Sequence, residues 1–109
     1  MDNDLFGVCP FVTAQKILSG KWSLIILYLL SRKTMRFNEL QKKLANITQA
    51  TLTKQLRAME DNGLITRTVF NQIPPKVEYS LNEMGLKFIP VLDALEVWGF
   101  QYIEYSKKE

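Results

Sequence analysis

Apolar residues recur along most of the chain at the spacing of helices that bury one side. A first helix is predicted from Pro10, whose missing N–H suits the first helical position, to Gly20, which ends it. Residues 21–31 are apolar on nearly every side, which predicts a buried central helix. A third helix is predicted from Asn38 onward, with leucines facing inward and polar residues facing outward.

A fourth helix is predicted over residues 48–62, where the pattern separates an apolar face from a polar one. Thr48 is a good N-cap, and Gly63 supplies a left-handed stop. The apolar face consists of Leu52, Leu56 and Met59. The opposite face consists of Ala50, Lys54, Arg57 and Asp61, with Thr53 on its flank. This helix therefore presents one small, polar and largely basic face.

The period of the pattern changes to two after Gly63, which is typical of strands. Residues 64–70 and 76–81 are predicted to pair as a β-hairpin. The intervening residues 71–75 form its loop, because two prolines cannot donate hydrogen bonds to a strand ladder.

The last helix is predicted to be one long element that begins at the cap Asn82 and is kinked by Pro90. Its apolar residues cover a wide arc instead of one stripe. One face holds Phe88, Leu92, Leu95, Tyr102 and Ile103, whereas Val91, Trp98 and Tyr105 lie roughly 80–90° around from it. Such an arc indicates more than one neighbour, and a second subunit is the expected one beyond the chain itself.

The order of these elements predicts a mainly α fold with a small β-hairpin, that is, a winged helix-turn-helix. The length of 109 residues fits a single domain, residues 1–109. A short turn at residues 45–47 joins the third and fourth helices into the helix-turn-helix. In this motif the second helix of the pair enters the major groove of DNA. Double-stranded DNA is therefore the expected partner.

The distribution of charge agrees with a polyanion as partner, and the composition excludes other functions. Residues 32–67 contain eight Lys or Arg and three Asp or Glu, a net charge of +5, although the whole chain carries only +3. A solvated surface gives the same pattern as a nucleic-acid interface, so charge alone leaves both open. With no His and one Cys, the chain is not expected to be an enzyme, to bind a metal or cofactor, or to form an internal disulfide.

No segment of the sequence has the pattern of a membrane span or a targeting signal. The most apolar run, residues 24–30, is far short of the ~20 residues that a bilayer requires. Asp2 and Asp4 make the N-terminal residues acidic, whereas a signal peptide starts with positive charge. We therefore expect a cytoplasmic protein without membrane contact.

The first turns of the fourth helix carry the candidate base contacts. The amide of Gln49 can pair with adenine, and Ala50 and the methyl group of Thr53 can contact thymine methyls. Contacts with base edges are predicted for Gln49, Ala50, Thr51, Thr53, Lys54 and Arg57. Lys54 and Arg57 can bind either guanine or phosphate. The alternative is that these residues only form the solvated face of an amphipathic helix.

Short motifs spread over the chain resemble a known family. They are Cys9-Pro10, Gly20-Lys21-Trp22, Arg36-Phe37-Asn38-Glu39-Leu40, Leu52-Thr53 with Leu56, and Asn62-Gly63-Leu64-Ile65. Further along come Pro74-Pro75-Lys76-Val77-Glu78-Tyr79-Ser80-Leu81 and the positions Gly85, Pro90, Leu95 and Trp98. In this combination the chain resembles the HxlR-type winged helix-turn-helix transcriptional regulators, which are related to the MarR group. It departs from them at Asn82, where Thr is common, and at Thr34-Met35.

The resemblance implies a homodimeric regulator that binds a near-palindromic operator. The recognition helix, residues 48–62, would enter the major groove, and the wing, residues 70–76, would contact the flanking minor groove or backbone. Backbone contacts are implied for Arg36, Asn38, Lys42, Lys43 and Thr48, and wing contacts for Gln72, Pro74 and Lys76. A dimer interface is implied at Phe11, Phe88, Leu92, Leu95, Trp98 and Tyr102. Repression is expected, because a small dimer can act by blocking the polymerase.

Cys9 is the lone cysteine and is predicted to be the N-cap of the first helix. A thiol at that place faces the positive end of the helix dipole, which favours the reactive thiolate. Some HxlR-type regulators sense oxidants or electrophiles through a cysteine there, so the resemblance implies redox sensing. The alternative is a small buried hydrophobe. A disulfide of Cys9 has to join two subunits or a small thiol.

Two other functions stay open on sequence alone. A winged helix that binds proteins would expose apolar residues over residues 49–57, where this chain has Lys54 and Arg57. A regulator that binds a small molecule at the dimer interface would line its pocket with aromatic rings, the candidates being Trp22, Phe88, Trp98 and Tyr102. Such rings more often form the core and the interface.

Overall fold

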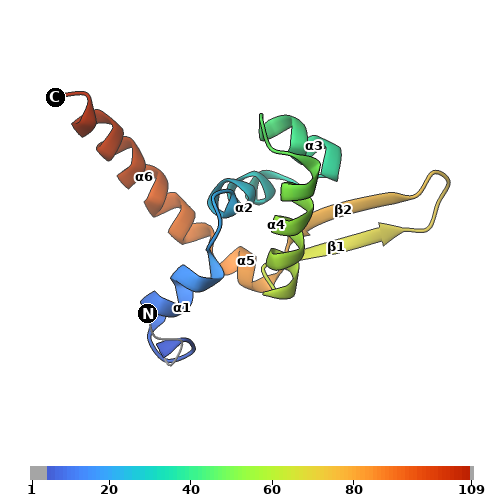
Figure 1. Ribbon diagram of the computed structural model, residues 1–109, viewed down its shortest axis with the longest axis horizontal. Coiled ribbons are helices and arrows are strands. Elements are labelled where there is room, and N and C mark those ends of the chain that lie inside the picture. Colours follow the sequence, from blue (N-terminus) through green and yellow to red (C-terminus); the bar gives the residue numbers. More distant parts are fainter. Residues whose placement is uncertain (1–4, 109) are drawn as a thin grey trace.

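The computed structural model describes residues 5–108, and the elements follow in the predicted order (Figure 1). The N-terminal helices are α1 (Pro10–Ile17), α2 (Ser23–Arg32), α3 (Phe37–Lys43) and α4 (Gln49–Asp61). The antiparallel strands β1 (Ile65–Phe70) and β2 (Lys76–Leu81) form the hairpin, and α5 (Glu83–Lys87) and α6 (Ile89–Ser106) follow. The predicted fold class, mainly α with a small β-hairpin, is confirmed.

The core lies between α2, α3, α4 and the base of the hairpin. Side chains that are at most 1% exposed come from each of these elements: Ile26, Leu27, Leu40, Leu52, Leu56, Met59 and Ile65. Full burial of one such side chain contributes roughly 1.5–3 kcal/mol. The apolar face predicted for α4 is the buried one, so its polar face points outward.

Helix α2 is buried on one side only, so the prediction of a helix buried on nearly every side was wrong. Its buried residues are Ser23, Ile26, Leu27 and Leu30. On the other side Leu24, Ile25 and Tyr28 are between 39% and 43% exposed. The reason is that α6 touches α2 only near its first turns, where Leu92 packs into the core, and then projects away from the body (Figure 1).

The hairpin is attached to the body at one end and projects from it at the other (Figure 1). Its strands pair in continuous register, and residues 71–75 form the loop, as predicted. At the base, Met35 and Tyr79 exchange two backbone hydrogen bonds, of 3.0 Å from the N–H of Met35 and 2.7 Å from the N–H of Tyr79. This bridge joins β2 to the segment before α3.

The C-terminal segment that was predicted as one long helix from Asn82 is two helices. Helix α5 ends at Lys87, and Ile89 begins α6, with Pro90 in the first turn of α6. Proline has no N–H for the preceding turn and its ring clashes with that turn, so it starts a helix here instead of kinking one. None of the helices within residues 5–108, α6 included, combines the length and the apolarity needed to cross a membrane.

Candidate nucleic-acid interface

A tight turn joins α3 to α4 and sets the angle between them. Asn46 has a left-handed backbone with φ 75°, a conformation that Asn tolerates better than most residues. Ile47 is 6% exposed and packs into the core. Its carbonyl oxygen accepts a hydrogen bond from Gln41 Nε2 at 3.4 Å. The turn is thus held by both the core and the preceding helix, so α4 leaves it in a fixed direction.

Both ends of α4 are capped as the sequence predicts. Thr48 Oγ1 accepts a hydrogen bond from the N–H of Thr51 at 3.1 Å and donates its own proton to Thr51 Oγ1 at 2.9 Å. At the other end Gly63 has φ 77°, and its N–H donates to the carbonyl of Glu60 at 3.0 Å. Residues other than glycine rarely adopt this conformation, so Gly63 lets the chain turn directly from α4 into β1.

The polar face of α4 lines a broad, open groove on the surface. The groove is formed by Gln49, Ala50, Thr53, Lys54, Arg57, Ala58 and Asp61. Five of the six residues predicted to contact bases therefore share one surface, and the sixth, Thr51, is exposed in the first turn. No large apolar side chain is among the lining residues, which disfavours a protein-binding module.

Helix α3 and its N-cap also carry exposed polar and cationic side chains. Arg36, Asn38, Lys42 and Lys43 are all exposed, as their predicted backbone contacts require. Within residues 5–108 the ion pairs are Lys33–Glu39 and Lys76–Glu78. In this part of the chain, no acidic group lies within 4 Å of the cationic groups of Arg36, Lys42, Lys43, Lys54 and Arg57.

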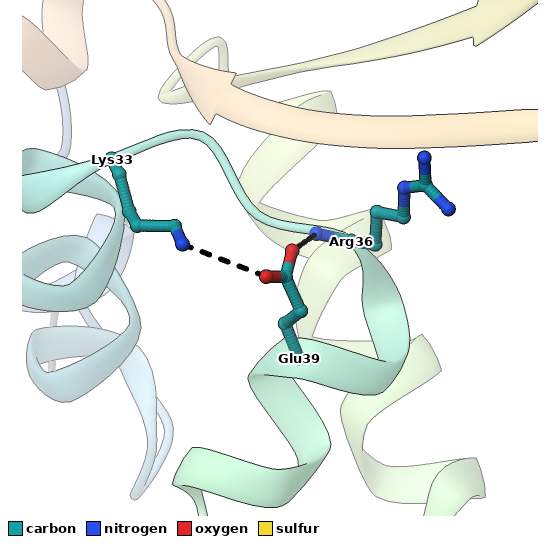
Figure 2. Close-up of polar contacts among 3 residues, drawn as sticks. All are labelled: Lys33, Arg36 and Glu39. Atoms are coloured by element: carbon teal, nitrogen blue, oxygen red, sulfur yellow. Dashed lines mark hydrogen bonds and ion pairs between the residues drawn. The ribbon is translucent and has the colours of Figure 1, made fainter.

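Glu39 fixes the start of α3, beside the exposed residue Arg36 (Figure 2). Its carboxylate accepts a hydrogen bond from the backbone N–H of Arg36 at 2.9 Å and lies 3.6 Å from Lys33 Nζ. The N–H of Arg36, followed by the charge of Lys33, holds the pKa of Glu39 below its usual value of 4.5. The guanidinium of Arg36 points away from this carboxylate.

The tip of the wing is exposed and uncharged. All of residues 71–75 are exposed, including the predicted contacts Gln72 and Pro74. Ile73 between them is 99% exposed. The contacts predicted for the wing do not include Ile73, although its place in the loop beside two prolines was visible in the sequence.

Lys76 does not lie at the tip, and its charge is engaged inside the wing. Its Nζ is 3.5 Å from the carboxylate of Glu78 and 4.4 Å from the centre of the Phe70 ring. These contacts leave the side chain only 25% exposed. The contact between Lys76 and the DNA backbone stays a prediction, and it would compete with these contacts inside the wing.

A buried polar contact between α2 and α4 escaped the sequence analysis. Ser23 is fully buried, donates its hydroxyl to the carbonyl of Ser19 at 2.6 Å and accepts from Gln55 Nε2 at 3.0 Å. Gly20 makes room for this amide, because a Cβ there would lie 2.5 Å from Gln55 Oε1. Ser23 and Gln55 are 32 residues apart in the sequence, so the spacing of residues within α4 does not predict their contact.

Arg67 on β1 is another residue that the sequence analysis left out of the site. With Arg57 and Glu60 it lines a cleft between α4 and the hairpin. The signal was present, because alternate strand residues share a face and Arg67 follows the buried Ile65 by two positions.

The sequence matches the HxlR-like helix-turn-helix family over residues 17–107. The chain belongs to this family. It is 47% identical over 100 residues to YdeP, an uncharacterized HTH-type transcriptional regulator of Bacillus subtilis (strain 168), a match that covers 92% of this chain and 78% of YdeP. The chain is therefore a transcriptional regulator of the helix-turn-helix type, and the resemblance based on short motifs is confirmed.

Solved structures of a redox regulator are similar to this HxlR-like chain. The structure of HypR in its reduced form matches with a TM-score of 0.86 and 36% identity, covering 92% of this chain and 99% of HypR. The oxidised form of HypR matches with a TM-score of 0.80 and 40% identity, covering 85% of this chain and 96% of that one.

In this HxlR-like chain Cys9 is the N-cap of α1, as predicted. Its carbonyl oxygen accepts a hydrogen bond from Thr13 Oγ1 at 2.8 Å, whereas its thiol makes no capping hydrogen bond. The residue is half-buried and lies outside the buried core cluster. Cys9 is therefore not a fully buried side chain of the core.

The residues implied at a dimer interface fall into two groups. Phe11, Leu95, Trp98 and Tyr102 are between 37% and 82% exposed. Leu92 is only 8% exposed because it packs into the core of its own chain, so it offers little surface to a second subunit. Phe88 and Trp22 also pack against the core. The rings of Trp98 and Tyr102 stack on each other with centroids 5.5 Å apart.

Proposed function

We propose that this chain acts as a homodimeric, sequence-specific DNA-binding repressor. Helix α4 is the recognition helix and lies in the major groove, and the wing follows the flanking minor groove or backbone. The observation that carries the proposal is the outward face of α4, which is polar and presents Lys54 and Arg57 without acidic partners among residues 5–108. Such a face offers both base contacts and neutralisation of phosphates.

The exposed area of the chain supports a dimer. The chain exposes 8213 Å². A compact protein of 12.6 kDa exposes roughly 6,200 Å². The radius of gyration is 15.7 Å, against roughly 13 Å for a compact domain of this length. An excess of about 2,000 Å² per chain is enough for the interface of an obligate dimer.

The exposed apolar residues of α1 and α6 are where we place the second subunit. Helix α6 alone exposes Val91, Leu95, Val97, Trp98, Phe100, Tyr102, Ile103 and Tyr105. Two recognition helices related by a two-fold axis would contact half-sites about 10 bp apart or a multiple of that. The operator is therefore near-palindromic. Backbone contacts by Arg36, Asn38, Lys42 and Lys43 would fix its register, and bound dimer would block the polymerase.

We also propose that Cys9 makes DNA binding responsive to oxidants or electrophiles. Cys9 is the N-cap of α1 and is half-buried, outside the buried core cluster. HypR, which is similar over most of this chain, is a redox regulator. Helix α1 is also one of the two helices to which we assign the dimer interface, so a change at Cys9 acts directly on assembly.

Selection of bound sequences from random DNA, with and without diamide, tests both parts of the proposal. Purified protein should enrich near-palindromic sites, with a log–log salt slope of roughly −0.9 for each neutralised phosphate. No preference over random DNA, or no dependence on salt, contradicts DNA recognition. Diamide should release wild-type protein and leave Cys9→Ser bound. An equal response of the two proteins contradicts redox sensing only, and leaves a small-molecule effector as the alternative signal.

A further inference from the structure

A cleft of about 410 Å³ lies between α4 and the hairpin, next to the groove on the polar face of α4. It is lined by Phe37, Thr53, Arg57, Glu60, Arg67 and Tyr79. Thr53 and Arg57 line the groove as well. The cleft therefore begins where the face proposed to contact bases ends, and it leads toward the wing.

Two arginines enter this cleft from different elements. Arg57 lies on α4, whereas Arg67 lies on β1, directly opposite Tyr79. Residues directly opposite each other in an antiparallel pair share one face of the sheet. Tyr79 is 8% exposed and belongs to the core cluster, so Arg67 is on the face that is turned toward the helices.

The positive charge in the cleft is only partly offset by the protein. Within residues 5–108 neither Arg57 nor Arg67 has a carboxylate within 4 Å. Glu60 lines the same cleft without forming an ion pair with either arginine. Two arginines and one glutamate give the lining a net charge of +1. Guanidinium groups match the geometry of phosphate oxygens, which they bind by two parallel hydrogen bonds.

We propose that this cleft binds the DNA backbone where the strand passes from the recognition helix to the wing, with Arg57 and Arg67 on phosphates there. The inference rests on the proposed DNA-binding function and adds Arg67 to the interface. Of the two roles open to Arg57, contact with guanine and contact with phosphate, the proposal assigns contact with phosphate. An arginine that faces the cleft together with Arg67 neutralises phosphate and fixes register, whereas Gln49 and Ala50 are left to contact bases.

Binding isotherms of Arg67→Ala at several salt concentrations test the inference. Loss of one phosphate contact in each subunit should make the log–log salt slope of a dimer shallower by about 1.8. Affinity should fall by the same factor on the selected operator and on a random duplex, because a phosphate contact carries no sequence information. Arg57→Ala should behave in the same way.

Three further variants serve as controls. Arg67→Lys keeps the charge and should retain most of the slope. Lys107→Ala removes a positive charge at the far end of α6 and should leave both affinity and slope unchanged. Glu60→Gln removes the one acidic group from the cleft lining, so it should tighten binding to both duplexes.

The possible failures are distinguishable. If wild-type protein shows salt-dependent operator binding and Arg67→Ala keeps its slope, the inference is wrong and the proposed function stands. A loss confined to the operator shows base reading and also overturns the inference. If Arg67→Ala does not fold, Glu60→Gln decides, since failure to tighten binding overturns the inference. Inorganic phosphate that binds wild type but not Arg67→Ala, with the DNA slope unchanged, assigns the cleft to a free anion instead. A wild-type protein that binds no DNA removes the proposed function itself.

Discussion

Large apolar side chains are buried in one region of the molecule and exposed in another. The first region is the body, residues 23–65, and the second consists of two arms, α1 and α6. In the body, Leu52 and Leu56 are at most 1% exposed. In the arms, Phe11 is 82% exposed and Trp98 is 61% exposed. The core is completed within one chain, with Leu92 of α6 as a member, whereas most large apolar side chains of the arms stay exposed. Folding of the body and assembly through the arms should therefore respond to different substitutions.

Leu56→Ala is expected to have the largest effect and to act on folding. It leaves a cavity at a site that is 1% exposed, so the free energy of unfolding should fall by about 3 kcal/mol. Urea denaturation at low protein concentration measures this loss. Phe11→Ala is the matched control in an arm and should change the stability of the monomer by less than about 0.5 kcal/mol. Equal losses for the two variants would abolish the distinction between body and arms.

Trp98→Ala should have the next largest effect, and it should act on assembly. A central interface tryptophan typically contributes about 2 kcal/mol or more, which is roughly a 30-fold weaker dimer. Sedimentation equilibrium measures the shift toward monomer, and far-UV circular dichroism should show an unchanged helical content. An unaltered dimer would place the interface elsewhere than on α6.

Ser23→Ala should have an intermediate effect at the border between the two regions. It leaves the amide of Gln55 and the carbonyl of Ser19 without their buried partner, which costs about 1–3 kcal/mol. Thermal unfolding measures the loss, and Ser31→Ala, also on α2 but exposed at its hydrogen bond, is the control. Adding Gln55→Leu to Ser23→Ala should recover much of the stability, because both polar groups are then gone. A double variant less stable than Ser23→Ala would show that loss of the contact between Ser23 and Gln55 does not cause the destabilisation.

Glu39→Gln should have the smallest effect, a loss of stability that is present at neutral pH and disappears in acid. The pKa of Glu39 is lowered in the folded chain, so its contribution is present above the usual value of 4.5 and is lost as the pH falls through the lowered pKa. Wild-type protein should therefore lose stability below pH 4.5 more steeply than Glu39→Gln does. Urea midpoints measured across this range compare the two proteins. Parallel curves would contradict a stabilising role for the contact with Arg36.

The sequence predicted the body well because its signals are local. The cap Thr48, the left-handed Gly63 and the period of Leu52, Leu56 and Met59 each act within a few residues, and the structure confirms all of them. Five of the six predicted base contacts share a groove for the same reason, since a helix fixes its faces by spacing alone.

The arms and the contacts between elements were harder to predict. An apolar pattern indicates that a face of a helix is buried. It does not indicate whether the same chain or a second chain covers that face. The prediction for α2 failed on this point, and the assignment of Leu92 to an interface did not anticipate that Leu92 packs into the core of its own chain. Pro90 is compatible with a kink and with a helix start, and only the packing selects between them. The contact between Ser23 and Gln55 likewise depends on tertiary packing.

The two tryptophans differ in their surroundings in a way that optical measurements can use. Trp22 packs against the core with Lys21 Nζ 5.2 Å from the centre of its ring, whereas Trp98 is exposed on α6 beside Tyr102. Indole emission shifts to the red when the ring is transferred into water. A chain that keeps only Trp22 thus carries a fluorescent probe of unfolding, and a chain that keeps only Trp98 carries one of subunit association.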